Sequence, residues 1–63
     1  MKWIKVSDSL PDEGVMVLTY KAYDDSFNVD YIMDIMDEKI WACTIHYDNY
    51  KTSHWCYLEK PKD

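Results

Sequence analysis

Four residues of the chain are of the types that bind zinc: Cys43, His46, His54 and Cys56. On a strand, residues three positions apart face opposite sides, so Cys43 and His46 cannot converge on one ion, although His54 and Cys56 can. The chain also lacks the Cys-x-x-Cys spacing that is typical of zinc sites. We therefore expect no metal and no cofactor, and we interpret the cysteines as reduced, buried, small apolar residues.

Catalysis by these residues is not favoured either. A nucleophilic Cys56 would need a neighbouring base and an oxyanion site, and a single glycine leaves few tight turns to build one. The sequence has no glycine-rich phosphate loop. It shows no carboxylate pair of the kind that acid–base catalysis uses. We expect that the protein is not an enzyme.

Acidic residues are concentrated in the middle of the chain. Half of the twelve lie between positions 24 and 38, and we take these six as candidate partner-binding residues: Asp24, Asp25, Asp30, Asp34, Asp37 and Glu38. Along one strand Asp30 and Asp34 would project from the same face about 13 Å apart, at a rise of ~3.3 Å per residue. Such a group is either a solvated edge that discourages aggregation or a patch that docks on a basic groove; both interpretations stay open.

Size and charge limit the classes of partner. The chain has 63 residues, a net charge of −5 and no Arg, which predicts one domain (residues 1–63) and disfavours binding to nucleic acid. No stretch approaches the roughly 20 apolar residues of a membrane span, and the N-terminus has no apolar signal region. We expect a cytoplasmic protein without membrane contacts. A homo-oligomer remains open.

Alternating apolar and polar residues favour strands over most of the chain. The pattern predicts extended segments at 3–6, 15–20, 29–38, 40–47 and 53–58, with a turn at 7–14 and polar loops at 21–28 and 48–51. Pro11 and Gly14 suit the turn because proline presets φ and glycine accepts a positive φ. Residues 37–39 contain no glycine, so we do not expect a two-residue primed hairpin turn there.

These segments predict a mostly β domain, a small curled antiparallel sheet of four or five strands. One short helix between residues 31 and 40 is the alternative, which would make the fold α+β. Several strands carry apolar residues on both faces, so the sheet needs closure, a covering helix or a partner. We expect Trp41 and Trp55 in the core, and Trp3 packed with Trp55 around it.

Both ends of the chain carry motifs of a known family. Residues 3–14 match Trp-Ile-x-Val-x-Asp-x-Leu-Pro-x-x-Gly, and His54-Trp55 lies near the C-terminus. In these motifs the chain resembles a family of short phage- and prophage-encoded proteins of unknown function, over nearly its whole length. Ser53 departs from the family pattern by separating Thr52 from His54. The resemblance implies an accessory protein in a bacterial cytoplasm and supplies no catalytic residues.

The leading hypothesis is a small acidic phage-type accessory protein that binds a host protein with a basic surface and inhibits a defence or replication factor. Small size, acidity and the absence of catalytic motifs support it. The alternative is a self-associating structural domain with no inhibitory role, whose apolar face meets its own copy.

Overall fold

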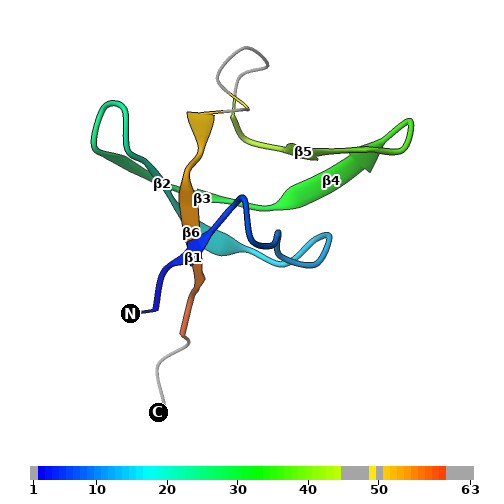
Figure 1. The fold of residues 1–63 in the computed structure, drawn as a ribbon. Helices are drawn as coiled ribbons and strands as arrows, with labels where there is room; N and C mark the ends of the chain where they lie inside the picture. The colour runs from blue at the N-terminus through cyan, green and yellow to red at the C-terminus, as the bar shows by residue number, and fades with distance from the viewer. Residues whose placement is uncertain (1, 45–48, 50, 60–63) are drawn as a thin grey trace.

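The computed structural model describes residues 2–44, 49 and 51–59. These residues form six strands and no α-helix: β1 (Ile4–Lys5), β2 (Val17–Lys21), β3 (Ser26–Asp30), β4 (Ile32–Ile35), β5 (Glu38–Trp41) and β6 (His54–Tyr57). Four of them make an antiparallel sheet in the order β1-β6-β2-β3, and β4 and β5 form a separate antiparallel hairpin (Figure 1). The predicted mostly β class is confirmed. The strands are divided between two sheets, and residues 31–40 adopt no helix.

The predicted strand at 29–38 is split into two. β3 ends at Asp30 and β4 begins at Ile32, with Tyr31 between them. The Tyr31 amide donates to the Asp30 carboxylate at 2.8 Å, and the Tyr31 carbonyl accepts from the Ala42 amide at 2.9 Å. These bonds satisfy the Tyr31 backbone outside the four-stranded sheet, so the chain leaves that sheet and enters the hairpin.

Other predicted boundaries also move; β2, for example, begins at Val17 and not at residue 15. β3 begins at Ser26, inside the loop predicted at 21–28, so only residues 22–25 connect β2 to β3. β5 ends at Trp41, and a turn follows it, which is earlier than the predicted strand end at residue 47. Residues 45–48 lie outside the described residues.

The turn between β4 and β5 is a two-residue connection, and the prediction against one was wrong. Ile35 pairs with Glu38, which leaves only Met36 and Asp37 between the strands. Their φ angles are 53° and 66°, and a type I′ turn requires φ > 0 at both central residues. The prediction failed because the paired strands hold Met36 in a conformation that non-glycine residues rarely adopt, and because Asp37 tolerates that conformation better than most residues.

The core lies between the inner face of the four-stranded sheet and the base of the hairpin. Val17 and Trp55 from the sheet pack with Ile32 and Trp41 from the hairpin, and all four are buried. The indole Nε1 of Trp55 donates to the Ser9 carbonyl at 2.9 Å, which ties the N-terminal loop to the core. Trp41 and Trp55 are therefore core residues, as predicted, and they supply much of the buried area of this small fold.

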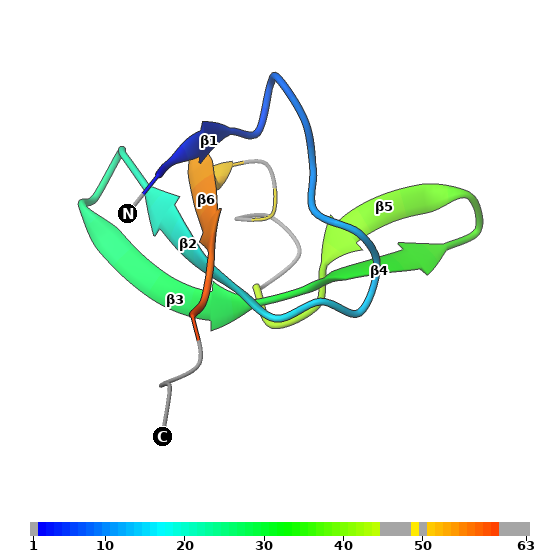
Figure 2. The ribbon, with the colours of Figure 1, turned by 90° about the horizontal axis from the view of Figure 1, so that it is seen from below.

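The N-terminal loop also holds the hairpin in place. The Gly14 amide donates to the Ile32 carbonyl at 3.0 Å, and Glu13 forms a parallel bridge with Ile32. Gly14 has a φ of 79°, so the predicted need for glycine at this turn is confirmed. From this anchor the rest of the hairpin extends away from the four-stranded sheet (Figure 2). Among the described residues no helix is long and apolar enough to cross a membrane.

Candidate functional site

The outer face of the four-stranded sheet, opposite the core, carries an apolar surface. Directly paired residues of antiparallel strands point to the same side, and Tyr20 pairs with both Phe27 and His54, while Leu18 pairs with Val29. We call the following six residues the outer face: Trp3, Leu18, Tyr20, Phe27, Val29 and His54. Phe27 is 56% exposed, Val29 48% and Trp3 36%. The remaining members are partly buried, and exposed apolar area of this kind is typical of interaction surfaces.

Three aromatic rings on this face contact one another. The centroid of Tyr20 lies 5.0 Å from that of Phe27 and 5.9 Å from that of Trp3, and Trp3 and Phe27 are 6.1 Å apart. The imidazole of His54 lies 6.0 Å from Tyr20. All three pairs among Trp3, Tyr20 and Phe27 are tilted, within the range of favourable aromatic contacts. The rings thus form a preorganised aromatic surface.

A pocket of about 300 Å³ opens at these rings, lined by Trp3, Tyr20, Asp25, Phe27 and His54. We call it the aromatic pocket. Its aromatic wall comes from three strands or their flanks, and the carboxylate of Asp25 comes from the loop between β2 and β3. The pocket therefore places aromatic rings beside a carboxylate, a combination that can recognise a ligand through both apolar and charged contacts.

The Asp25 carboxylate is held against the pocket by Tyr20. The Tyr20 hydroxyl donates to Asp25 Oδ1 at 2.7 Å. This hydrogen bond, followed by partial desolvation and the negative charges of Asp25 and Asp24, raises the pKa of the Tyr20 phenol above its ordinary value. Asp25 has a φ of 58°, a left-handed conformation that Asp and Asn tolerate better than most residues. The backbone of the loop therefore orients the carboxylate toward Tyr20.

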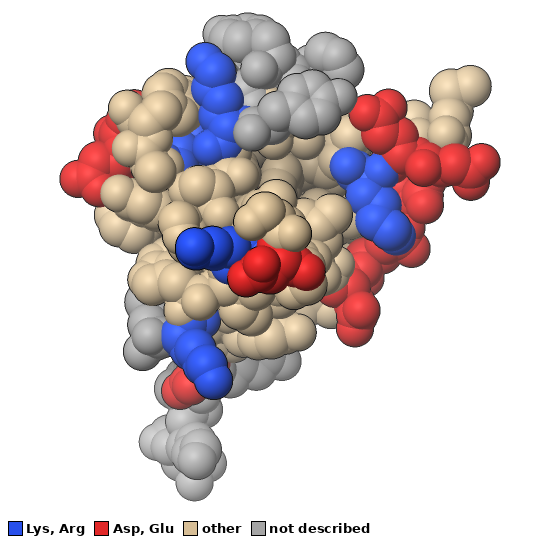
Figure 3. Space-filling view, viewed as in Figure 1, with Lys and Arg blue, Asp and Glu red and all other residues tan. Residues whose placement is uncertain are grey.

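The six acidic residues predicted as a partner-binding set do not lie together. Asp24 and Asp25 occupy the β2–β3 loop, whereas Asp34, Asp37 and Glu38 occupy the β4–β5 hairpin. These two groups lie at opposite margins of the molecule (Figure 3). Only the first group adjoins the outer face, through Asp25.

Asp30 is not part of any acidic surface, so its predicted exposure was wrong. Its side chain is fully buried. Its Oδ1 accepts hydrogen bonds from the Tyr31 and Cys43 amides, each at 2.8 Å, and its Oδ2 accepts from the Thr44 hydroxyl at 2.6 Å. A buried carboxylate is stable only when hydrogen bonds replace its water. Asp30 therefore connects the end of β3 to the turn after β5.

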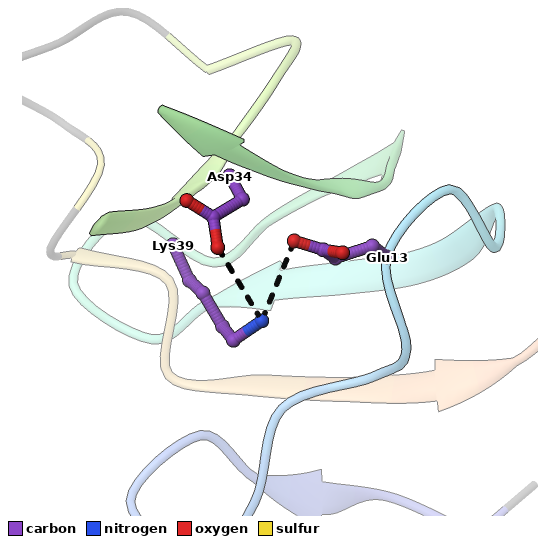
Figure 4. Close-up of polar contacts among 3 residues, drawn as sticks. All are labelled: Glu13, Asp34 and Lys39. Atoms are coloured by element: carbon purple, nitrogen blue, oxygen red, sulfur yellow. Dashed lines mark hydrogen bonds and ion pairs between the residues drawn. The ribbon is translucent and has the colours of Figure 1, made fainter. Parts of the chain in front are cut away.

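The acidic group on the hairpin is partly neutralised by Lys39. The Lys39 ammonium lies 3.4 Å from Glu13 Oε1 and 3.9 Å from Asp34 Oδ2 (Figure 4). These side chains are about half exposed or somewhat less, so each ion pair contributes at most about 1 kcal/mol. Lys39 links the hairpin to the N-terminal loop and lowers the net negative charge at this margin.

The thiols and imidazoles considered for zinc are spread over the fold. Cys56 is buried in β6, as predicted, whereas Cys43 is exposed beyond β5, so the prediction that it is buried was wrong; both are free thiols. His54 lines the aromatic pocket, and His46 lies outside the described residues. No three metal-ligating side chains gather anywhere in the described part of the chain. The expectation of a protein without metal stays a prediction.

The sequence analysis named Asp25 among the candidate partner-binding residues but missed the aromatic residues that line the pocket with it. Trp3 was expected to pack with Trp55, but it lies on the opposite side of the sheet, 36% exposed, because it precedes Ile4, the residue paired with Trp55. Phe27 fell in the predicted loop. The signal was present in the alternation of Phe27 and Val29, which places both on one face of a strand that begins at Ser26.

Comparison with known proteins places the chain in a family. A family described as "Protein of unknown function (DUF551)" matches residues 2–62. No curated protein matches the chain, and no solved structure matches it. Because this match covers nearly the whole sequence, the chain belongs to the DUF551 family of proteins of unknown function.

Proposed function

We propose that the protein is a small accessory protein of phage or prophage type that binds a host protein with a basic surface through its outer face. The observation that carries the proposal is the contact cluster of Trp3, Tyr20 and Phe27, in which Trp3 and Phe27 are exposed and Tyr20 is partly buried. Aromatic residues that are packed yet exposed resemble the anchors that dominate binding energy in protein interfaces. A sheet of this size gains stability by burying such rings, so leaving them at the surface favours a binding role.

Charge supports a basic partner over a second copy of the same chain. The protein has a net charge of −5, and Asp24 and Asp25 lie in the loop beside the outer face. Two copies that meet through this face carry the same net negative charge, and their mutual repulsion costs binding energy. A basic surface would instead be attracted and oriented before contact.

The mode of action that we expect is occupation of a surface. Since we expect no catalytic activity, we propose that the protein affects its partner by blocking access to the bound surface. A basic groove is what a nuclease or polymerase offers to nucleic acid. Inhibition of a defence or replication factor is therefore the consequence that we propose for binding, in the cytoplasm of a bacterial host.

Affinity purification from a bacterial lysate with three baits tests the proposal. The baits are the wild type, a Phe27→Ser/Val29→Ser variant of the outer face, and Met36→Ser as the matched control. Met36 is 94% exposed at the tip of the hairpin, so its replacement removes exposed apolar area far from the outer face. We expect one stoichiometric basic protein with the wild type and the control, lost with the outer-face variant and weakened by high salt.

Two results would contradict the proposal. If the outer-face variant recovers the same protein as the wild type, the binding surface lies elsewhere. If the bait recovers only an untagged copy of itself, and sedimentation shows a dimer that the outer-face variant abolishes, the self-associating alternative is correct. In that arrangement β3 would supply the contact, because it is a five-residue edge strand that pairs with β2 alone among the described strands.

A further inference from the structure

We propose that the aromatic pocket binds a cationic side chain, a Lys ammonium or an Arg guanidinium, of the protein partner. The source of the cation rests on the proposed function, whereas the affinity of the pocket for a cation is a property of this chain alone. The contact would be made by the rings of Trp3, Tyr20 and Phe27 and by the carboxylate of Asp25, which all line the pocket.

The rings supply the first half of the recognition. A cation within about 6 Å of a ring centroid is attracted to the negative face of the π system, most strongly for Trp. Since the three ring centroids lie 5.0–6.1 Å from one another, one cation in the pocket can interact with more than one ring. The apolar walls also suit the methylene stem of Lys or Arg, which packs along apolar surface while its charged end stays polar.

The Asp25 carboxylate supplies the second half. It lines the same pocket as the three rings and is oriented by the Tyr20 hydroxyl at 2.7 Å. A carboxylate accepts charge-assisted hydrogen bonds from ammonium and guanidinium groups, and Asp24 adds a second negative charge in the same loop. An anionic ligand is disfavoured by these charges, and a neutral apolar ligand would leave the Asp25 carboxylate without a complementary charge.

One aromatic residue of the β2–β3 loop, Tyr23, already contacts a cationic side chain of this chain. The Lys51 ammonium lies 4.7 Å from the centroid of the Tyr23 ring. Tyr23 belongs to the β2–β3 loop, as Asp25 does. The ring of Tyr23 in this loop is thus accessible to an ammonium group, and the nearby acidic residues Asp24 and Asp25 add to the attraction.

Titration with blocked amino acids, followed by NMR, tests the pocket without knowledge of the partner. The probes are the Nα-acetyl methylamides of lysine, arginine and norleucine; norleucine keeps the apolar stem of lysine and lacks its charge. We expect lysine or arginine to shift the ring resonances of Trp3, Tyr20 and Phe27, and norleucine to shift them much less. Equal shifts with norleucine, or no shifts with either cation, would overturn the proposal.

Two variants test the two halves of the site. Asp25→Asn removes the charge while keeping an oxygen for Tyr20 and a residue that tolerates a φ of 58°. Phe27→Leu removes one ring and keeps an apolar side chain. We expect each variant to weaken binding of the cationic probe about 3-fold to 30-fold, the range of cation–π and exposed charge contributions. Unchanged affinity in both variants would overturn the proposal.

Asp37→Asn is the matched control. Asp37 is also an exposed aspartate with a positive φ, 66°, but it lies on the hairpin, away from the pocket. Its replacement changes the net charge of the protein by the same amount as Asp25→Asn does. Because Asp37 lies away from the pocket and salt screens exposed charges over distance, we expect less than about a 2-fold effect on probe binding. If Asp37→Asn weakens binding as much as Asp25→Asn does, the attraction is a general charge effect and the pocket is not a cation site.

The outcomes distinguish the pocket from the proposed function. If the probes do not bind but the outer-face variant still loses its host protein, the docking surface stands and the cation site fails. If the probes bind in the pocket but no partner depends on the outer face, the cation site stands and the proposed function fails.

Discussion

Asp30 shows how one side chain can join the two sheets. Its carboxylate accepts hydrogen bonds from two backbone amides. One belongs to Tyr31, where the chain leaves the four-stranded sheet, and the other to Cys43, in the turn that follows the β4–β5 hairpin. The carboxylate is fully buried, so its three hydrogen bonds, including that from Thr44, replace the water that it loses.

Replacing Asp30 therefore has a graded effect on stability. Asp30→Ala leaves two backbone amides without an acceptor and should lower the free energy of unfolding by about 3 kcal/mol or more. Asp30→Asn keeps one acceptor oxygen and should cost about 1–2 kcal/mol. Urea denaturation followed by Trp fluorescence measures both. An Asp30→Ala variant within about 0.5 kcal/mol of the wild type would mean that Asp30 does not connect the sheets.

Cys43 provides a pH-dependent test of the same region. Partial desolvation, then the nearby Asp30 carboxylate, raises the pKa of the Cys43 thiol above its ordinary value. The folded state therefore favours the neutral thiol, so less of the reactive thiolate is present at mildly alkaline pH. Alkylation of Cys43 should be slower in the folded protein than in urea, and its half-maximal rate should occur at a higher pH.

Mass spectrometry after iodoacetamide treatment measures this reaction. Cys56 is buried and serves as the internal comparison, because it should react only on unfolding. A half-maximal rate for Cys43 at or below the pH found in urea would contradict the raised pKa. Asp30→Asn removes the negative charge of Asp30, the second cause of the raised pKa of Cys43. The dependence of the Cys43 alkylation rate on pH should then move toward that measured in urea.

At the scale of elements, the β4–β5 turn carries avoidable strain. Met36 and Asp37 both have positive φ, and non-glycine residues in this region each cost about 1 kcal/mol or more. The strands on either side hold the turn in register through the pairs Ile35–Glu38 and Asp34–Lys39. The strain is tolerated because the base of the hairpin is anchored in the core by Ile32 and Trp41.

Met36→Asn/Asp37→Gly installs the residues that a type I′ turn favours. We expect the free energy of unfolding to rise by about 1–2 kcal/mol, which corresponds to roughly 4–8 °C in Tm for each kcal/mol. Calorimetry measures the change. Met36→Ala/Asp37→Ala is the control, since alanine removes the native side chains without favouring positive φ. An Asn-Gly variant no more stable than the wild type would argue against the type I′ conformation.

At the scale of the whole molecule, the two acidic groups lie at opposite margins (Figure 3), so they should contribute unequally to partner binding. Asp24→Lys reverses a charge beside the outer face, while Glu38→Lys reverses one on the hairpin. Charges at the rim of an interface act mainly on the association rate. We expect Asp24→Lys to slow association with the host protein about 3-fold to 10-fold at low salt, and Glu38→Lys to change it much less.

Stopped-flow or biosensor kinetics at two salt concentrations measure these rates. The difference between the variants should shrink at high salt, because exposed charges are screened. Equal slowing by the two variants would show that net charge matters and its location does not. A larger effect from Glu38→Lys would place the docking surface on the hairpin.

Several features of this protein follow from its sequence alone. Alternation of apolar and polar residues and runs of β-branched and aromatic residues predict the mostly β class. Trp41 and Trp55 are predicted core residues because a short chain needs large buried side chains. Gly14 is predicted at a turn with positive φ because few other residues tolerate that conformation. Each of these depends on local chemistry or on the total size of the chain.

The tertiary structure decides what local chemistry leaves open. A strand with apolar residues on both sides does not indicate which side will be covered, so only the packing of the hairpin against Val17 and Trp55 places Trp3 and Phe27 outside. Likewise Asp30 has the same local character as the exposed acids near it, and it is buried because distant backbone amides supply its hydrogen bonds. Local alternation has a period of two residues, whereas burial depends on contacts between segments far apart in the chain.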